Sequence, residues 1–139
     1  MRRVPGIIAV AAFLRRHDPA VAHWPVGRLL AWLRWHWANG GVGIVGQRGR
    51  IVAVGVARCV HTIEDAENEA YEHDEKAPML WVDQLASTHP LGLPLLLAQA
   101  RTRFGPRETV CGHVFKRPGE LRMLPWKRVE RLLEHHGLN

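Results

Sequence analysis

One segment in the second half of the chain constrains the fold most strongly. An apolar stretch at 79–86 carries a single acidic residue, Asp83, and a loop rich in proline and glycine follows at 87–94. The apolar residues at 95–104 predict a helix, and a strand-like run begins again at 109–115. A strand, a helix and a second strand in this order form a crossover. The crossover places the two strands parallel to each other in one sheet.

Asp83 and the loop after it indicate a site as well as a fold. A carboxylate inside an apolar strand costs free energy unless it is paired or hydrogen-bonded. Asp83 is therefore either a functional carboxylate or the ion-pair partner of a core arginine, such as Arg58 on a neighbouring strand. The loop leads into a helix whose first N–H groups have no partner in their own helix, so it is a candidate anion site.

Hydrophobic periodicity predicts the remaining elements. They are helices at 5–16 and 25–37, strands at 42–46, 51–60 and 79–86, a helix at 95–104, strands at 109–115 and 121–124, and a helix at 126–135. The polar, acidic stretch 61–76 predicts a solvated excursion or a short exposed helix. This order predicts an α/β (α+β) fold with a mixed, mostly antiparallel sheet and helices on both faces. At 139 residues, we expect one domain, 1–139.

Charge is unevenly distributed along the chain. The net charge of the whole chain is +6, but the stretch 61–76 is acidic, so the rest of the chain is much more positive than this total. Basic residues crowd the C-terminal third: Arg101, Arg103, Arg107, Lys116, Arg117, Arg122, Lys127, Arg128 and Arg131. Such a surface attracts polyanions, namely nucleic acid, an acidic protein or a phosphorylated cofactor. Solubility alone accounts for the charge equally well.

The N-terminus resembles a signal peptide only in part. Two arginines precede an apolar run, but Arg15 and Arg16 separate that run from the small residues at 20–22. The run is also far shorter than the ~20 apolar residues that cross a bilayer. We therefore expect a cytoplasmic protein without a membrane partner.

The cysteines and histidines do not predict a metal centre. Cys59 and Cys111 lie in apolar strand-like runs and match no metal or disulfide framework, so we expect both to be buried. His135 and His136 form a pair near the C-terminus without further ligands.

Three short motifs resemble those of the toxin-activating lysine acyltransferases, which transfer a fatty acyl group to an internal lysine of a pore-forming toxin. The first, D-P-A-V-A-H-W-P-V at 18–26, is similar to the family's proline, catalytic histidine and Trp-Pro-Val helix start. The second, W-V-D-Q-L-A at 81–86, is similar to an aromatic residue, an aspartate and Ile-Ala. The third is the loop ending at Gly92, with a helix closing on Phe104. The element order matches from about Asp18 to Arg128.

This resemblance implies an acetyltransferase-like fold and a site. His23, shifted by about two residues from the family position, would act as the general base, and Asp83 would orient it. The acyl donor would be acyl carrier protein or acyl-coenzyme A, and the acceptor a protein lysine. The donor's phosphates would lie at Ala86, Ser87, Thr88, His89 and Gly92. Of the glycine-rich phosphate loop typical of the wider acetyltransferase class, only Gly92 is present.

Two other functions remain open. A module that kept the acetyltransferase-like fold but lost the chemistry would bind nucleic acid or an acidic partner through its basic residues. A phage-type structural or accessory protein would instead associate with another subunit or with itself as a homo-oligomer, using an exposed apolar patch near Trp35, Trp37 or Trp126.

Overall fold

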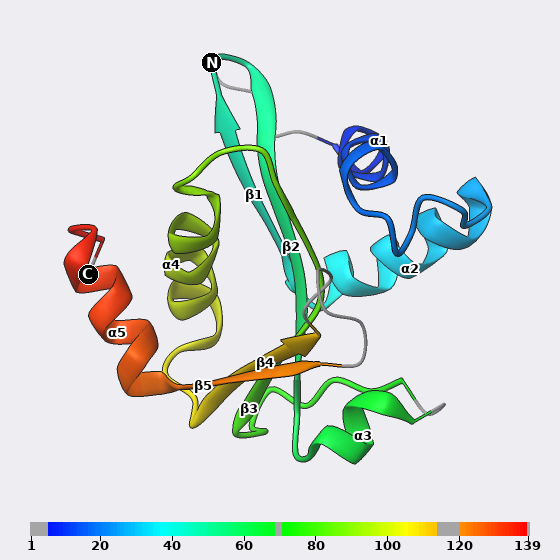
Figure 1. The fold of residues 1–139 in the computed structure, drawn as a ribbon. Helices are drawn as coiled ribbons and strands as arrows, with labels where there is room; N and C mark the ends of the chain where they lie inside the picture. Colours follow the sequence, from blue (N-terminus) through cyan, green and yellow to red (C-terminus); the bar gives the residue numbers. More distant parts are fainter. Residues whose placement is uncertain (1–5, 69–70, 114–119, 139) are drawn as a thin grey trace.

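The computed structural model describes residues 6–68, 71–113 and 120–138. It shows one five-stranded sheet with helices packed on both faces (Figure 1). The elements in chain order are α1 (Ile7–His17), α2 (Val26–Ala38), β1 (Val42–Gln47), β2 (Arg50–Val60), α3 (Ile63–Glu67), β3 (Met79–Ser87), α4 (Gly92–Phe104), β4 (Thr109–His113), β5 (Leu121–Pro125) and α5 (Trp126–His135). The fold class predicted from the sequence is confirmed.

The strands lie in the sheet in the order in which they occur in the chain. β1 and β2 form an antiparallel hairpin, and β2 pairs antiparallel with β3. β3 and β4 are parallel because α4 connects them, as the crossover predicts, and β5 returns antiparallel to β4. α4 starts at Gly92, earlier than predicted, because Pro94 is tolerated in the first turn of a helix. Most of the turn predicted at 116–120 lies outside the described residues.

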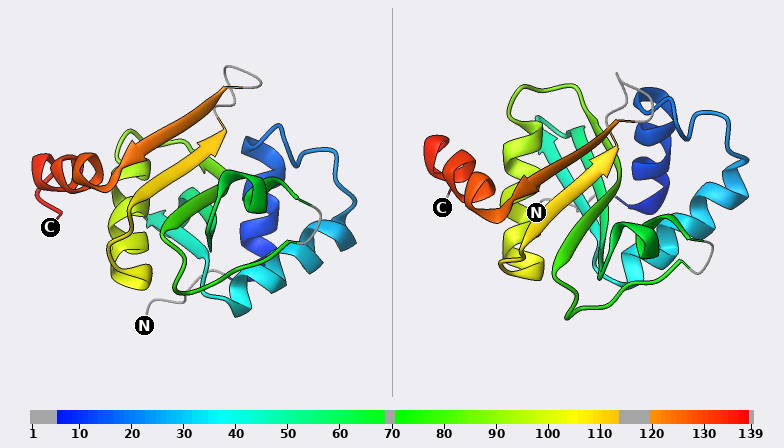
Figure 2. Two further views of the ribbon diagram at one scale, coloured as in Figure 1. Left: turned by 90° about the horizontal axis from the view of Figure 1, so that it is seen from below. Right: turned by 60° about the horizontal axis from the view of Figure 1, so that its bottom comes forward.

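Each face of the sheet is covered by a different pair of helices (Figure 2). α1 and α2 cover one face and bury Leu14 and Leu29 against Val54 of β2. α4 and α5 cover the other face, where Leu97 and Trp126 pack with Leu80 of β3. The sheet is therefore apolar on both sides, and polar side chains inside it are exceptions that require partners.

The acidic stretch 61–76 packs more closely than the sequence predicts. It contains the short helix α3, but Ala66 is buried and the His73 side chain is only 4% exposed. The Cys59 N–H donates to His73 Nδ1 at 2.9 Å, which ties the stretch to β2. The expected solvated excursion is thus confirmed only for part of its length.

Both cysteines are free and buried, as predicted. Within the described ranges, none of the helices combines the length and apolar character needed to cross a bilayer.

Candidate functional site

β3 changes its pairing at Asp83. Val82 lies opposite Ala57 of β2, whereas Gln84 lies opposite Val56, so Asp83 is an extra residue in the ladder. This is a β-bulge, a feature that bends a strand and re-aims its side chains. The parallel pairing with β4 ends at the same place, where Val82 lies opposite Gly112. Within the described residues, β3 after Val82 therefore keeps only one paired edge.

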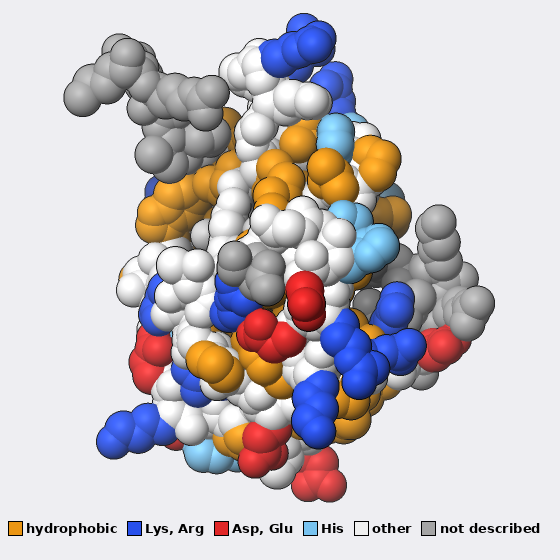
Figure 3. All heavy atoms as spheres, turned by 90° about the vertical axis from the view of Figure 1, so that its left-hand side faces the viewer, with side chains coloured by type: hydrophobic (Ala, Val, Ile, Leu, Met, Phe, Trp, Pro, Cys, Tyr) orange, Lys and Arg blue, Asp and Glu red, His pale blue; other side chains and the backbone are white. Residues whose placement is uncertain are grey.

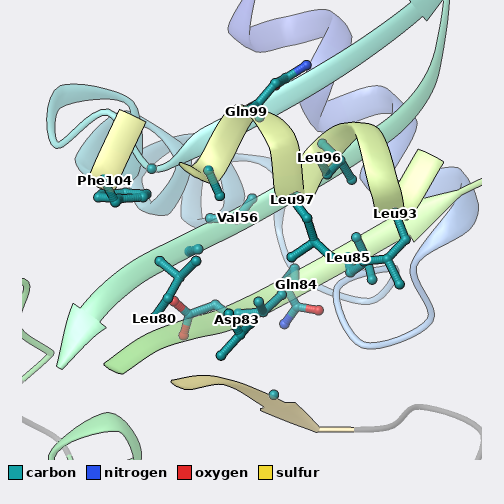
Figure 4. A pocket seen from close by; sticks show the side chains of 18 of the residues that line it. Val56, Leu80, Asp83, Gln84, Leu85, Leu93, Leu96, Leu97, Gln99 and Phe104 are labelled. Atoms are coloured by element: carbon teal, nitrogen blue, oxygen red, sulfur yellow. The ribbon is translucent and has the colours of Figure 1, made fainter. Parts of the chain in front are cut away.

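A cavity of about 590 Å³ lies between α4 and the sheet (Figure 4). It reaches the point where the pairing of β3 with β4 ends, which we call the β3–β4 split. Its wall on the α4 side is apolar and includes Leu93, Leu96 and Leu97. Gly43 and Gly55 form part of the sheet side, and a Cβ built at Gly43 would lie 3.1 Å from Leu96. Small residues on the sheet and leucines on the helix thus leave an apolar space. Asp83 and Gln84 line its β3 side.

Asp83 is held by a buried arginine. Arg58 Nε lies 3.1 Å from Asp83 Oδ2, and the Arg58 side chain is 1% exposed. The guanidinium also donates to the carbonyl oxygens of Ala66 and Glu72 and stacks 3.7 Å from the Tyr71 ring. The ion pair expected as one of the two explanations of Asp83 is therefore present. Asp83 is also one of the residues that line the cavity, so the ion pair lies at its border.

An imidazole does lie beside Asp83, but it belongs to His36 of α2. His36 Nε2 is 3.7 Å from Asp83 Oδ2 and 2.6 Å from the Tyr71 hydroxyl. Trp32 Nε1 donates to the same hydroxyl at 3.1 Å. Asp83, Arg58, His36, Tyr71 and Trp32 thus form one polar cluster between α2, the 61–76 stretch and the sheet.

Burial sets the charges in this cluster. It raises the pKa of Asp83 to about 6, although the nearby Arg58 charge favours the ionised form. Burial, together with the Arg58 charge, lowers the pKa of His36 to about 3, so its ring is neutral at pH 7. Burial and the Asp83 charge also raise the pKa of Tyr71, which keeps its proton. Asp83 is therefore the member of the cluster that can change its charge near neutral pH.

His23 does not reach Asp83. It is exposed in the turn before α2 and makes no hydrogen bond or ion pair with the carboxylate. The helix explains the difference, because His36 lies ten residues after Val26, roughly 15 Å along the axis. The buried face of α2 presents His36 to the sheet, while His23 precedes the helix. The structure therefore does not bring together the pair suggested by the resemblance.

Sequence reasoning missed His36 as a neighbour of Asp83. Its spacing of four from Trp32 places it on a helix stripe with Trp32 and Trp35, a pattern typical of core packing. Tyr71 was hidden in an acidic, apparently solvated stretch. No signal in the sequence related either residue to Asp83.

Most backbone donors of the predicted phosphate loop have partners within the protein. The donors and acceptors are Thr88 N–H to the Val52 carbonyl, His89 N–H to Ser87 Oγ, Leu91 N–H to His89 Nδ1, and Gly92 N–H to the His89 carbonyl. Pro90 and Pro94 have no N–H to offer. The N–H groups expected to hold phosphates are therefore largely occupied by partners in the loop and by Val52 of β2.

Two of the predicted loop residues have structural roles. Ala86 is 5% exposed and belongs to the core under α1 and α2, on the face of the sheet opposite α4. Gly92 is required by close packing, since a Cβ there would lie 2.0 Å from Ser87 Oγ. Ser87, at the end of β3, and Thr88 are exposed, and His89 in the turn before α4 is partly buried.

Comparison with known proteins supports the fold. No protein-family model matches this sequence, and no curated protein sequence matches it. Among solved structures, the chain is similar to the GNAT-like decarboxylase GphF in complex with isobutyryl-CoA, with a TM-score of 0.56 and 24% sequence identity. The match covers 76% of this chain but only 60% of that one. The chain therefore has a GNAT-like fold. The finer resemblance to toxin-activating lysine acyltransferases rests on the sequence motifs alone.

Proposed function

We propose that this protein binds an acyl thioester in the cavity at the β3–β4 split and transfers the acyl group to an amine, such as a protein lysine. The observation that carries the proposal is the combination of an apolar cavity with a carboxylate, Asp83, at the bulge where the sheet opens. The GNAT-like fold supports it, and the similar decarboxylase GphF was solved with an acyl-CoA.

The cavity suits the two ends of such a ligand. Its leucine-lined part would bury an acyl chain, and its volume of about 590 Å³ is ample for one. The free edge of β3 after Val82 carries backbone N–H and C=O groups without a β4 partner among the described residues. Thioesters of both coenzyme A and carrier proteins have a pantetheine arm with amide groups, which can pair with such an edge as an added strand does.

Asp83 would supply the base. A lysine ammonium with a pKa of ~10.4 must lose a proton before its nitrogen attacks a thioester carbonyl. Ionised Asp83 accepts that proton, the C–N bond forms, and the C–S bond then breaks with the thiolate taking up a proton. A pKa of about 6 makes Asp83 a stronger base than an ordinary carboxylate while leaving it ionised at pH 7. Arg58 would fix its orientation. His36 is less suited, because it is neutral and fully buried behind Asp83.

We favour acyl carrier protein over acyl-coenzyme A as the donor. The loop at 87–92 leaves few free N–H groups for a diphosphate, whereas a carrier protein presents a single phosphodiester and a strongly acidic surface. β5 and α5 expose cations that form no ion pair within the described parts of the chain, and Arg122 also lines the cavity. These residues are Arg122, Lys127, Arg128 and Arg131. Figure 3, which faces the side bearing α4 and α5, shows Lys and Arg side chains gathered near exposed hydrophobic ones.

A second candidate is a module that binds the acyl thioester without transferring the acyl group. The observation in its favour is the tight pairing of Asp83 with Arg58, together with the absence of His23 from the cluster. In this case the carboxylate stabilises the bulge and performs no chemistry.

The two candidates and the two donors can be separated in one set of assays. Purified protein is titrated with the same acyl group on carrier protein and on coenzyme A, and acyl transfer to a lysine peptide is followed by mass spectrometry. We expect binding of acyl carrier protein and transfer that Asp83→Asn removes. Binding without transfer would support the second candidate, stronger binding of acyl-coenzyme A would reverse the donor assignment, and no binding of either would contradict both candidates.

A further inference from the structure

Two glutamines line the cavity, and their amides differ in their bonding. Gln99 of α4 pairs with the backbone of edge strand β1, because its Oε1 accepts the Ile44 N–H at 3.0 Å and its Nε2 donates to the Ile44 carbonyl at 2.7 Å. Gln84 of β3 has no such partner. Its Oε1 is buried and accepts no hydrogen bond within the described part of the chain. A buried amide oxygen without a donor is costly, so Gln84 requires an explanation.

The Gln84 side chain points away from α4. Leu85 faces α4, since the space above Gly55 is bordered by both Leu96 and Leu85. Successive side chains of a strand point to opposite sides, so Gln84 turns away from the leucines of α4. Figure 4 shows it on the side of β3 opposite Leu93 and Leu97. Gln84 therefore follows Asp83 at the point where the described pairing of β3 with β4 has ended.

The surroundings of the Gln84 amide oxygen limit the kinds of ligand group that it can bind. An ammonium group would bind the neighbouring Asp83 carboxylate rather than the Gln84 amide, because a carboxylate is the stronger acceptor for a cation. A neutral N–H donor matches a neutral amide oxygen without bringing a further charge into an apolar space. The β3 edge beside Gln84, which has no β4 partner among the described residues, offers backbone groups of the same kind, and these suit a ligand that carries secondary amides.

We propose that Gln84 is a specificity-determining residue that accepts a hydrogen bond from a secondary amide N–H of the bound thioester's arm. This inference rests on the proposed function and names the part of the ligand that the site recognises. Coenzyme A and carrier proteins share this amide-containing arm, so the contact is common to both donors. Gln84 would hold the arm so that the thioester carbonyl lies beside Asp83.

The test compares two small thioesters that differ in one group. The first is S-octanoyl-N-acetylcysteamine, which has one secondary amide, and the second is its ester counterpart, in which oxygen replaces the amide N–H. Dissociation constants are measured by calorimetry for the full chain. We expect the wild-type protein to bind the amide compound about five- to tenfold more tightly than the ester, the effect of one hydrogen bond to a buried acceptor.

Variants assign that difference to a residue. Gln84→Leu and Gln84→Met should bind both compounds with affinities within about twofold of each other. Gln99→Leu is the matched control. It removes another glutamine of the same cavity, but one whose amide is already paired with Ile44. This variant should keep the preference for the amide compound. Equal binding of the two compounds by the wild-type protein would overturn the inference, as would a preference that persists in the Gln84 variants. Failure of both compounds to bind would instead contradict the proposed function on which the inference rests.

Discussion

The two halves of β3 have opposite characters. From Met79 to Val82 the strand is paired on both edges, with β2 on one side and β4 on the other, and its side chains are mainly apolar. After Val82 the β4 pairing ends, a bulge intervenes, and Asp83 and Gln84 appear in succession. A polar pair thus occurs where β3 has no β4 partner among the described residues, and both residues line the cavity. The two polar side chains and the cavity therefore occur where the described pairing with β4 ends.

The largest effect is expected from replacing Arg58, the ion-pair partner of Asp83. Arg58→Met should leave Asp83 with its charge uncompensated in a buried position and lower the free energy of unfolding by about 3–5 kcal/mol. Urea denaturation monitored by tryptophan fluorescence measures this. Adding Asp83→Asn to the variant should recover much of the loss. If Arg58→Met unfolds like the wild-type protein, the two halves of β3 do not differ in their need for polar partners.

The charge of Asp83 should also appear in the pH dependence of stability. Its pKa is about 6 in the folded chain against ~3.9 in an unfolded one, so the folded state binds the proton more tightly. The stabilising contribution is complete below about pH 4 and is lost as the pH rises through 6. Relative to Asp83→Asn, the wild-type protein should therefore lose roughly 2–3 kcal/mol between these values. Parallel pH curves for the two proteins would show that Asp83 titrates normally.

The charge of Asp83 should affect stability and acyl transfer in opposite ways. Stability decreases as the pH rises through about 6, whereas the transfer rate increases. If Asp83 is the base, the rate of acyl transfer to a lysine peptide should increase as the pH rises through about 6, and Asp83→Asn should reduce it roughly 10²- to 10⁴-fold. A transfer rate that keeps its pH profile in Asp83→Asn would assign the proton transfer to another group.

A smaller effect is expected where the first residue of α4 packs against the end of β3. Gly92→Ala should cost about 1–3 kcal/mol of stability, since the added methyl group would collide with Ser87 Oγ and lie 2.9 Å from Ala53 Cβ. Ser87→Gly in the same chain should relieve most of this loss. A Gly92→Ala variant of normal stability with weakened acyl-coenzyme A binding would instead restore the phosphate-loop interpretation.

Local patterns in the sequence predicted the fold well, because helix periodicity and turn residues are local signals. The crossover from β3 through α4 to β4 followed from element order, and the final helix follows from the spacing of Val129 and Leu133. The site was predicted less completely. Asp83 stood out as an acid in an apolar strand, and its pairing with Arg58 was one of two stated explanations.

The remaining site residues depend on contacts between distant segments. His36 reaches Asp83 from another helix, and Tyr71 reaches it from a stretch whose acidic composition indicated solvent exposure. The bulge that separates Asp83 from its β2 register depends on pairing, which no local pattern encodes. The occupied N–H groups of the loop before α4 also depend on Val52 of another strand and on side-chain geometry.

Occupation of the cavity by a thioester is the central claim, and a substitution that fills the cavity tests it most directly. A Cβ at Gly55 would meet Leu96 at 3.4 Å, an ordinary contact, so Gly55→Val should fold while its methyl groups occupy part of the space beneath α4. Calorimetry with S-octanoyl-N-acetylcysteamine should show binding to the wild-type protein and at least a tenfold weaker affinity for a folded Gly55→Val variant. Equal affinity for the two proteins would contradict the account, because the ligand would then bind elsewhere.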